Sequence, residues 1–300
     1  MMSETNSDDA LNVDTLYLLK EFWSHFSENK GAVFGLVLIG TFIFIAILAP
    51  ILAPYGPSQV FPDALTLPPI WSEGGSFTYI LGTDDLGRDI LSRLIYGARV
   101  SLFVGVSIVI ISTLIGTTLG LFAGYFGGKV DSVIMRFIDI LMAYPSILLA
   151  IIVVSVIGPG MTNAIIAVAI VNIPSFTRLV RANVLEVKKR QFVMAAKTFG
   201  AGPIRIMVKE ILPNCMATLI VQTTLGLSEG ILSTAALGFL GLGVQPPTPE
   251  WGIMLSDARP YIESSPWLVT LPGLCILAVV LGLNLFGDGL RDALDPKLRR

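Results

Sequence analysis

Residues 191–214 read QFVMAAKTFGAGPIRIMVKEILPN and interrupt an otherwise strongly apolar chain with a short basic segment. A first helix is predicted to end at Gly200, and the Gly-Pro pair after it breaks the chain direction. A second, amphipathic helix is predicted over residues 204–212, stopping at Pro213 because proline removes a helical hydrogen bond. Residues 191–214 therefore form a compact knob and not a membrane span. This helix-turn-helix order favours docking to another protein over a patch for anionic lipid.

The composition is that of a membrane protein. The chain has 300 residues, of which 53% are hydrophobic and 14% charged, and its mean hydropathy is +0.76. A helix needs about 20 mostly apolar residues to cross roughly 30 Å of hydrocarbon, so we expect an all-α integral membrane protein. One histidine and two separated cysteines cannot supply a metal site. We expect no cofactor and no nucleic-acid partner.

Six apolar segments are long enough to be transmembrane helices. They cover residues 31–53, 99–123, 134–157, 162–180, 215–240 and 267–286. With the N-terminus inside, the outward-facing residues among the 20 lysines and arginines are Arg88, Arg93, Arg99 and Arg259. The excess of positive charge on the inner side predicts that both termini are cytoplasmic.

This topology divides the chain into five parts. Residues 1–30 are a cytoplasmic tail, residues 31–53 the first transmembrane helix and residues 54–98 an outer loop. Within that loop, residues 86–97 are predicted to form an interfacial helix with Arg88, Asp89 and Arg93 on its polar side. Residues 99–290 form the core, which includes the inner loop 181–213, and residues 291–300 are a second cytoplasmic tail.

Glycines and prolines indicate how the spans pack. Gly116, Gly120 and Gly124 recur every fourth residue, which favours a face where another helix approaches closely. Pro145 and Pro174 are predicted to kink the third and fourth spans.

Polar side chains inside the spans are candidates for lining a transport path. Glu229 lies about two-thirds of the way across the fifth span, where an ionisable group should face protein or a water-filled path. An interhelical hydrogen bond is the alternative role for Glu229. Tyr144 and Asn172, near the two prolines, are further candidates. Arg136 and Asp139 are instead expected to pair along one face of the third span.

The chain carries no catalytic machinery. No G-x-x-x-x-G-K-[ST] loop is present to cradle phosphates. Residues 226–230, GLSEG, match the G-x-S-x-G pattern of serine hydrolases, but the only histidine, His25, lies in the N-terminal tail and cannot act as the base. The protein is therefore predicted not to be an enzyme, and transport driven by ATP would need a separate ATPase.

The knob resembles the cytoplasmic EAA motif of importer-type ABC permeases, in which E-A-A is followed after three residues by G and later by L-P. The residues that match are Met194, Ala195, Ala196, Gly200, Leu212 and Pro213, with methionine where glutamate is usual. Residues 82–102 (GTDDLGRDILSRLIYGARVSL), 236–251 (ALGFLGLGVQPPTPEW) and 287–297 (GDGLRDALDPK) resemble signatures of peptide and nickel importers. Residues 21–33 (EFWSHFSENKGAV) and 61–76, which include DALTLPPIWSEGGS, are similar to the C-type dipeptide permeases.

The resemblance implies a type I ABC importer permease in a bacterial inner membrane. It implies a heterodimer with a homologous B-type permease, two ABC ATPase subunits inside and a periplasmic peptide-binding protein outside. The matching knob residues, together with Pro203, would form the element that docks on the ATPase. ATP binding and hydrolysis would then drive alternating access for dipeptides or other short peptides.

Other functions stay open at this stage. Nickel-chelate, oligopeptide and antimicrobial-peptide permeases share the central motifs, and a permease sequence does not identify its cargo. A secondary transporter would need intramembrane carboxylates or ion sites, for which Glu229 alone is thin support.

Overall fold

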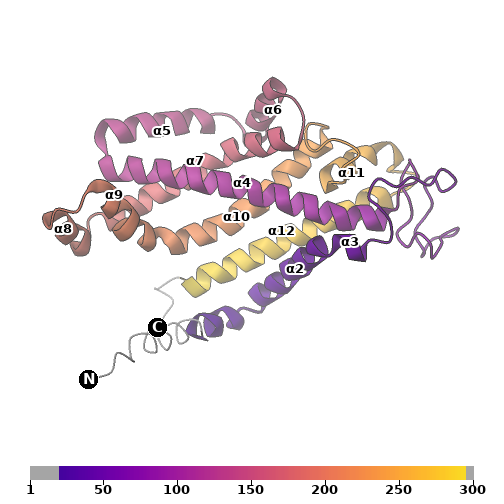
Figure 1. Cartoon of the computed structure of the whole chain (residues 1–300), viewed down its shortest axis with the longest axis horizontal. Helices are drawn as coiled ribbons and strands as arrows, with labels where there is room; N and C mark the ends of the chain where they lie inside the picture. Colours follow the sequence, from indigo (N-terminus) through magenta and orange to yellow (C-terminus); the bar gives the residue numbers. More distant parts are fainter. Residues whose placement is uncertain (1–19, 295–300) are drawn as a thin grey trace, which may run out of the picture.

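The computed structural model describes residues 20–294, which form a helical bundle (Figure 1). After a helical segment at residues 20–28 come α2 (Lys30–Ile47), α3 (Ala49–Leu52), α4 (Ile90–Phe126), α5 (Gly128–Met142), α6 (Ser146–Ile157) and α7 (Met161–Val187). The second half holds α8 (Gln191–Thr198), α9 (Pro203–Arg205), the π-helix η1 (Ile206–Ile211), α10 (Leu212–Phe239), α11 (Trp251–Asp257), the 3₁₀ turn η2 (Arg259–Tyr261) and α12 (Trp267–Leu294). The predicted tails lie mostly outside the described residues.

The long helices run along the longest axis of the molecule (Figure 1). In the described part of the chain, α2, α4, α7 and α12 are each long and apolar enough to cross a membrane. The pair α5 and α6 makes a fifth candidate if it counts as one broken span. α10 has 28 residues and is not in this set.

The predicted glycine face of the second span is confirmed. A Cβ on Gly116 would lie 2.5 Å from the Cβ of Phe176, and one on Gly124 would lie 2.7 Å from the Cβ of Val184. Gly120 approaches Val180 in the same way. α4 and α7 therefore pack backbone to backbone, as small residues allow in membrane helices.

The third predicted span is a broken helix. α5 and α6 meet at an angle of 93°, and the break falls at Ala143, Tyr144 and Pro145. Pro145 lacks the amide hydrogen that would continue α5, so the predicted kink is present as a full interruption. Pro174, by contrast, lies inside the uninterrupted helix α7.

The predicted pair of Arg136 and Asp139 is wrong. Asp139 accepts a hydrogen bond from Arg178 of α7 at 2.5 Å, so the ion pair joins two helices instead of running along one. Because α5 packs against α7, Asp139 meets the cation Arg178, which the spacing of residues within α5 does not predict.

The prediction of a separate interfacial helix at residues 86–97 is wrong, because most of these residues belong to the long helix α4. Asp89 caps the N-terminus of α4, with its carboxylate accepting the Ser92 amide at 2.8 Å, and the helix then runs unbroken to Phe126. Arg88 and Arg93 are buried and do not form an exposed polar side. The boundary predicted at residue 98 therefore falls within α4.

The two ends of the bundle are built differently. α8 and α9 project at one end, and the long loop between α3 and α4 lies at the other, beside α11 (Figure 1). At the first end, Phe26 of the helical segment 20–28 packs edge-on against Phe286 of α12, with ring centroids 5.8 Å apart.

Candidate functional site

The first helix of the knob ends as the sequence predicts. Gly200 adopts a positive φ of 81°, and its amide donates to the carbonyl of Lys197 at 3.1 Å. The next amide, that of Ala201, donates to the carbonyl of Ala196 at 3.0 Å. This pair of bonds closes a helix with a left-handed residue, a conformation that glycine adopts without strain. Gly200 therefore fixes the direction in which the chain leaves α8.

The second helix of the knob does not stop at Pro213. α9 passes into the π-helix η1 and then directly into α10, with Pro213 in the first turn of α10. A proline ring clashes with the carbonyl four residues before it, and the wider π turn relieves that clash. The knob is therefore continuous with a long helix of the bundle.

The knob is held to the bundle by one apolar face. Val193 of α8 is buried against Ile206, Met207 and Ile211 of η1, in a cluster that continues into α7 and α10. Burial of one medium-sized apolar side chain contributes roughly 1.5–3 kcal/mol to stability, so these contacts hold the short helix α8 in one position against η1.

The rest of the knob surface is apolar and exposed. Phe199 is 90% exposed, and Ile204 and Val208 are also largely open. Met194 and Phe192 add to this surface from α8. Soluble surfaces seldom gather such residues, so the patch is suited to contact with a partner. Sequence reasoning missed Phe199 and Ile204, although an aromatic residue beside the helix-ending glycine was the available signal.

The structure gathers the predicted coupling residues into this one knob. Met194, Ala195, Gly200, Pro203 and Pro213 are exposed, and Ala196 and Leu212 are partly buried.

The base of the knob is tied to its neighbours by charge. The Arg181 guanidinium forms two hydrogen bonds with the Asp131 carboxylate of α5, at 2.5 and 2.6 Å. Lys188, at the end of α7, donates to the carbonyl of Gly124 at 2.6 Å. A bidentate pair fixes orientation as well as distance, so the end of α7 that precedes the knob is held against α4 and α5.

The three predicted path residues do not form one site. Glu229 of α10 and Tyr144 at the α5–α6 break are exposed, whereas Asn172 is buried inside α7. The amide nitrogen of Asn172 has no hydrogen-bond partner within the described residues.

The opposite end of the molecule consists of residues 54–89 together with α11, and is called the outer cap here because the topology predicted from the sequence places it outside. α11 fits tightly against α10, because a Cβ on Gly252 would overlap the carbonyl of Ala235. Glu250 caps α11 by accepting the amides of Gly252 at 2.9 Å and Ile253 at 3.0 Å. Burial raises the pKa of the Glu250 carboxyl, and these hydrogen bonds oppose that rise.

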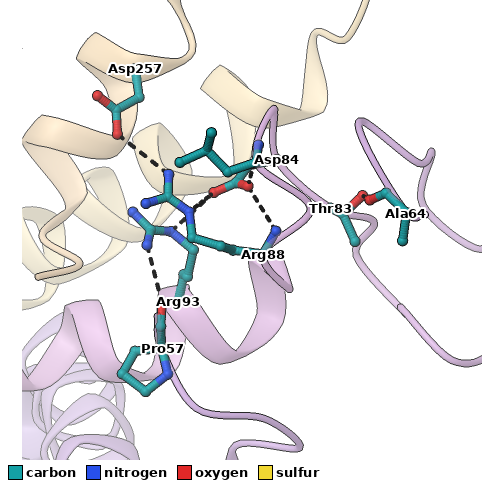
Figure 2. A network of polar contacts seen from close by, with 8 residues as sticks. Pro57, Ala64, Thr83, Asp84, Arg88, Arg93 and Asp257 are labelled. Carbon is teal, nitrogen blue, oxygen red and sulfur yellow. Dashed lines mark hydrogen bonds and ion pairs between the residues drawn. The ribbon is translucent and has the colours of Figure 1, made fainter. Parts of the chain in front are cut away.

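A buried ion network secures the loop of the outer cap (Figure 2). The Asp84 carboxylate pairs with Arg88 at 2.6 Å and with Arg93 at 3.4 Å. Arg88 also faces Asp257 of the α11 segment at 3.8 Å, and Arg93 donates to the carbonyl of Pro57 at 3.1 Å. One carboxylate thus joins the loop to the start of α4, and Arg88 extends the network to α11.

The sequence and fold match known transport proteins. Residues 116–300 match the family model of the binding-protein-dependent transport system inner membrane component, and residues 18–69 match the N-terminal TM domain of oligopeptide transport permease C. The dipeptide transport system permease protein DppC of Haemophilus influenzae is 53% identical over 98% of this chain and 100% of its own. The di/tripeptide permease DppC of Pseudomonas aeruginosa is 56% identical over 94% of this chain and 93% of its own.

A solved structure supports the fold. An inward-facing MetNI methionine ABC transporter matches with a TM-score of 0.57 at 20% identity, over 69% of this chain and 98% of that chain. With the knob, the glycine-packed helices and these matches in place, the chain belongs to the family of binding-protein-dependent transport system inner membrane components.

Proposed function

We propose that the chain is a permease subunit that imports dipeptides across a bacterial inner membrane, driven by separate ATPase subunits. The observation that carries this proposal is the knob, which projects from the bundle with an exposed apolar surface on a seated helix. Relatives at 53% and 56% identity that carry the names of dipeptide and di/tripeptide permeases support the cargo.

The proposed assembly contains a homologous B-type permease, two ABC ATPase subunits and a periplasmic peptide-binding protein. The knob would dock on one ATPase subunit, with Met194, Ala195, Ala196 and Gly200 shaping the docking helix. Since Met194 stands where glutamate is usual, contact at that position would be apolar, as it would be at the exposed Phe199 at the end of the same helix. The outer cap faces the side from which a binding protein would deliver the peptide.

The proposed topology has six spans with both termini inside. α10 would be the fifth span, in spite of its polar residues, and the α5–α6 pair the third. Labelling of single cysteines tests this arrangement in intact cells. A cysteine at Phe77 in the outer cap should react with a membrane-impermeant maleimide, whereas one at Lys197 in the knob should react only after the membrane is opened.

Reconstitution tests the function directly. The complex in proteoliposomes, with the binding protein outside, should accumulate labelled dialanine when ATP is supplied to the ATPase side. Vanadate should abolish this uptake, and a protonophore should not, because the energy comes from ATP and not from an ion gradient. Uptake that stops with the protonophore would point to a secondary transporter, and uptake of a nickel chelate in place of dialanine would correct the cargo.

A further inference from the structure

One face of α10 is open and polar. Thr218, Gln222, Leu225 and Glu229 follow one another at spacings of four, three and four residues, so their side chains form a stripe along one side of the helix. Thr218, Leu225 and Glu229 are exposed, whereas Ile231 on the far side is buried in the bundle. A carboxylate at this depth is costly against lipid, so the stripe should border a wet or polar space.

The inner part of this stripe lines a cavity. Its volume is about 370 Å³, and its walls include Leu179 of α7, Thr218, Gln222 and Leu225 of α10, and Arg291 of α12. Arg291 is the charged residue among those walls. Cavities of a few hundred Å³ are large enough to bind a small organic molecule.

Arg291 and Glu229 present opposite charges at two levels of one surface. None of the ion pairs within residues 20–294 involves either of them. Asp292, the neighbour of Arg291, instead accepts a hydrogen bond from Asn29 at 3.2 Å. The guanidinium and the carboxylate are therefore both available to a ligand.

The helix geometry sets the spacing of the two charges. Gly287 of α12 packs against Thr224 of α10, and Arg291 lies one turn closer to the knob end. Glu229 is five residues from Thr224 in the other direction, so the two charged residues are separated by the rise of nine residues, roughly 13.5 Å along the bundle. An extended peptide advances about 3.3–3.6 Å per residue, so two or three residues span roughly 7–10 Å. The long side chains of arginine and glutamate cover the remainder.

We propose that Arg291 and Glu229 bind the two charged ends of a short peptide in transit. Arg291 donates hydrogen bonds to the C-terminal carboxylate, and Glu229 accepts hydrogen bonds from the N-terminal ammonium group, while Gln222 offers hydrogen bonds to the peptide backbone between them. The site selects for length and for free ends, not for side chains, which would suit an importer of many dipeptides. This inference rests on the proposed function as a peptide importer.

Protection of a reporter cysteine tests the site without the binding protein. Leu225→Cys is placed in a chain whose own cysteines are replaced by alanine, and the assembled complex in detergent is labelled with a maleimide. Millimolar dialanine should slow labelling at least fivefold. N-acetyl-dialanine and dialanine amide, each lacking one terminal charge, should protect several times more weakly.

Two variants separate recognition of the ends from a general structural role. Glu229→Gln should make dialanine and N-acetyl-dialanine protect equally, and Arg291→Gln should make dialanine and dialanine amide protect equally. Glu229→Asp and Arg291→Lys, which keep the charges, should retain the preference. Glu73→Gln and Arg99→Gln, on exposed positions elsewhere, serve as charge-matched controls and should behave as the parent does.

The outcomes distinguish this site from the function on which it rests. The site is overturned if dialanine does not slow labelling of the reporter cysteine. It is also overturned if both variants lose protection to the same extent for all three peptides. Either result would count against the site even if the parent complex imports dialanine. A parent complex that imports no dipeptide in proteoliposomes overturns the proposed function, and this inference with it.

Discussion

The knob and the outer cap are held in place by different kinds of contact. In the outer cap, Arg88 and Arg93 are buried and share the Asp84 carboxylate, so charge is enclosed and satisfied. In the knob, Phe199 is 90% exposed, so apolar surface is left uncovered. Because the cap also exposes Phe77 and Trp71, exposed apolar surface does not distinguish the two ends. They differ in how they are held, the cap by a buried ion network and the knob by the apolar contacts of Val193.

This difference fits the role proposed for each end. A rigid cap holds the loops of the outer side in one arrangement through polar contacts that are costly to break. A docking element must leave binding surface exposed while keeping its own shape, which here depends on Val193 in its seat and on the glycine that ends α8. The following changes test that contrast, from the largest expected effect to the smallest.

Removing the shared carboxylate of the cap should have the largest effect. Asp84→Ala leaves two buried guanidinium groups without their partner, and breaking a buried pair in this way costs about 3–5 kcal/mol. Amide hydrogen exchange in residues 54–89 should become much faster, while exchange in the knob stays as it was. Asp85→Ala, next in sequence and outside the ion network, is the matched control. A cap that stays protected in Asp84→Ala would show that the network does not hold the loop.

A charge on the knob should weaken docking without affecting the fold. Phe199→Asp is expected to weaken binding of the ATPase subunits to the permease pair in nanodiscs by about 2 kcal/mol, or roughly 30-fold, as for an exposed aromatic anchor. Phe77→Asp is the matched control, since Phe77 lies in the outer cap and is 87% exposed. If Phe199→Asp and Phe77→Asp bind the ATPase subunits equally well, Phe199 of the knob does not contribute to docking.

Straining the end of α8 should have a moderate effect. Gly200→Ala places a Cβ at a φ of 81°, which costs about 1–2 kcal/mol, although nothing lies within 4 Å of that Cβ. Gly202→Ala is the control, because Gly202 has a φ of −69° and is equally open. Exchange of the α8 amides should be several-fold faster in the first variant only. Similar exchange in both would mean that the left-handed turn does not stabilise the knob.

The smallest effect should be a pH dependence of the cap. Because burial raises the pKa of Glu250 above its ordinary value of 4.5, the folded cap binds that proton more tightly than the unfolded segment does. Protection of α11 should therefore fall as pH rises from about 4.5 through the raised pKa. Glu250→Gln should remove this dependence. Hydrogen-exchange protection of α11 that increases with pH over this range would contradict a raised pKa of Glu250.

Local signals in the sequence were enough for much of the fold. Gly116, Gly120 and Gly124 predicted the packing face of α4, and Gly200 predicted the end of α8, because a missing side chain has a direct geometric consequence. Pro145 predicted a kink, and the structure shows a complete break there.

What could not be predicted depends on contacts between distant segments. Arg88 and Arg93 are polar by type, and only their shared partner Asp84 and the covering α11 make them buried. Asp139 pairs across to Arg178, 39 residues away in sequence, for the same reason. Pro213 was expected to end a helix, but the π-helix η1, which packs against Val193, precedes it and the chain continues into α10.

The most direct test of the central claim is the number of dipeptides imported per ATP hydrolysed. In proteoliposomes, Gly200→Val keeps the apolar surface of the knob but distorts the turn that orients α8. We expect this variant to hydrolyse ATP while importing at least tenfold fewer peptides per ATP than the parent, with Gly202→Val close to the parent. An unchanged ratio in Gly200→Val would contradict the claim that the shape of the knob couples hydrolysis to transport.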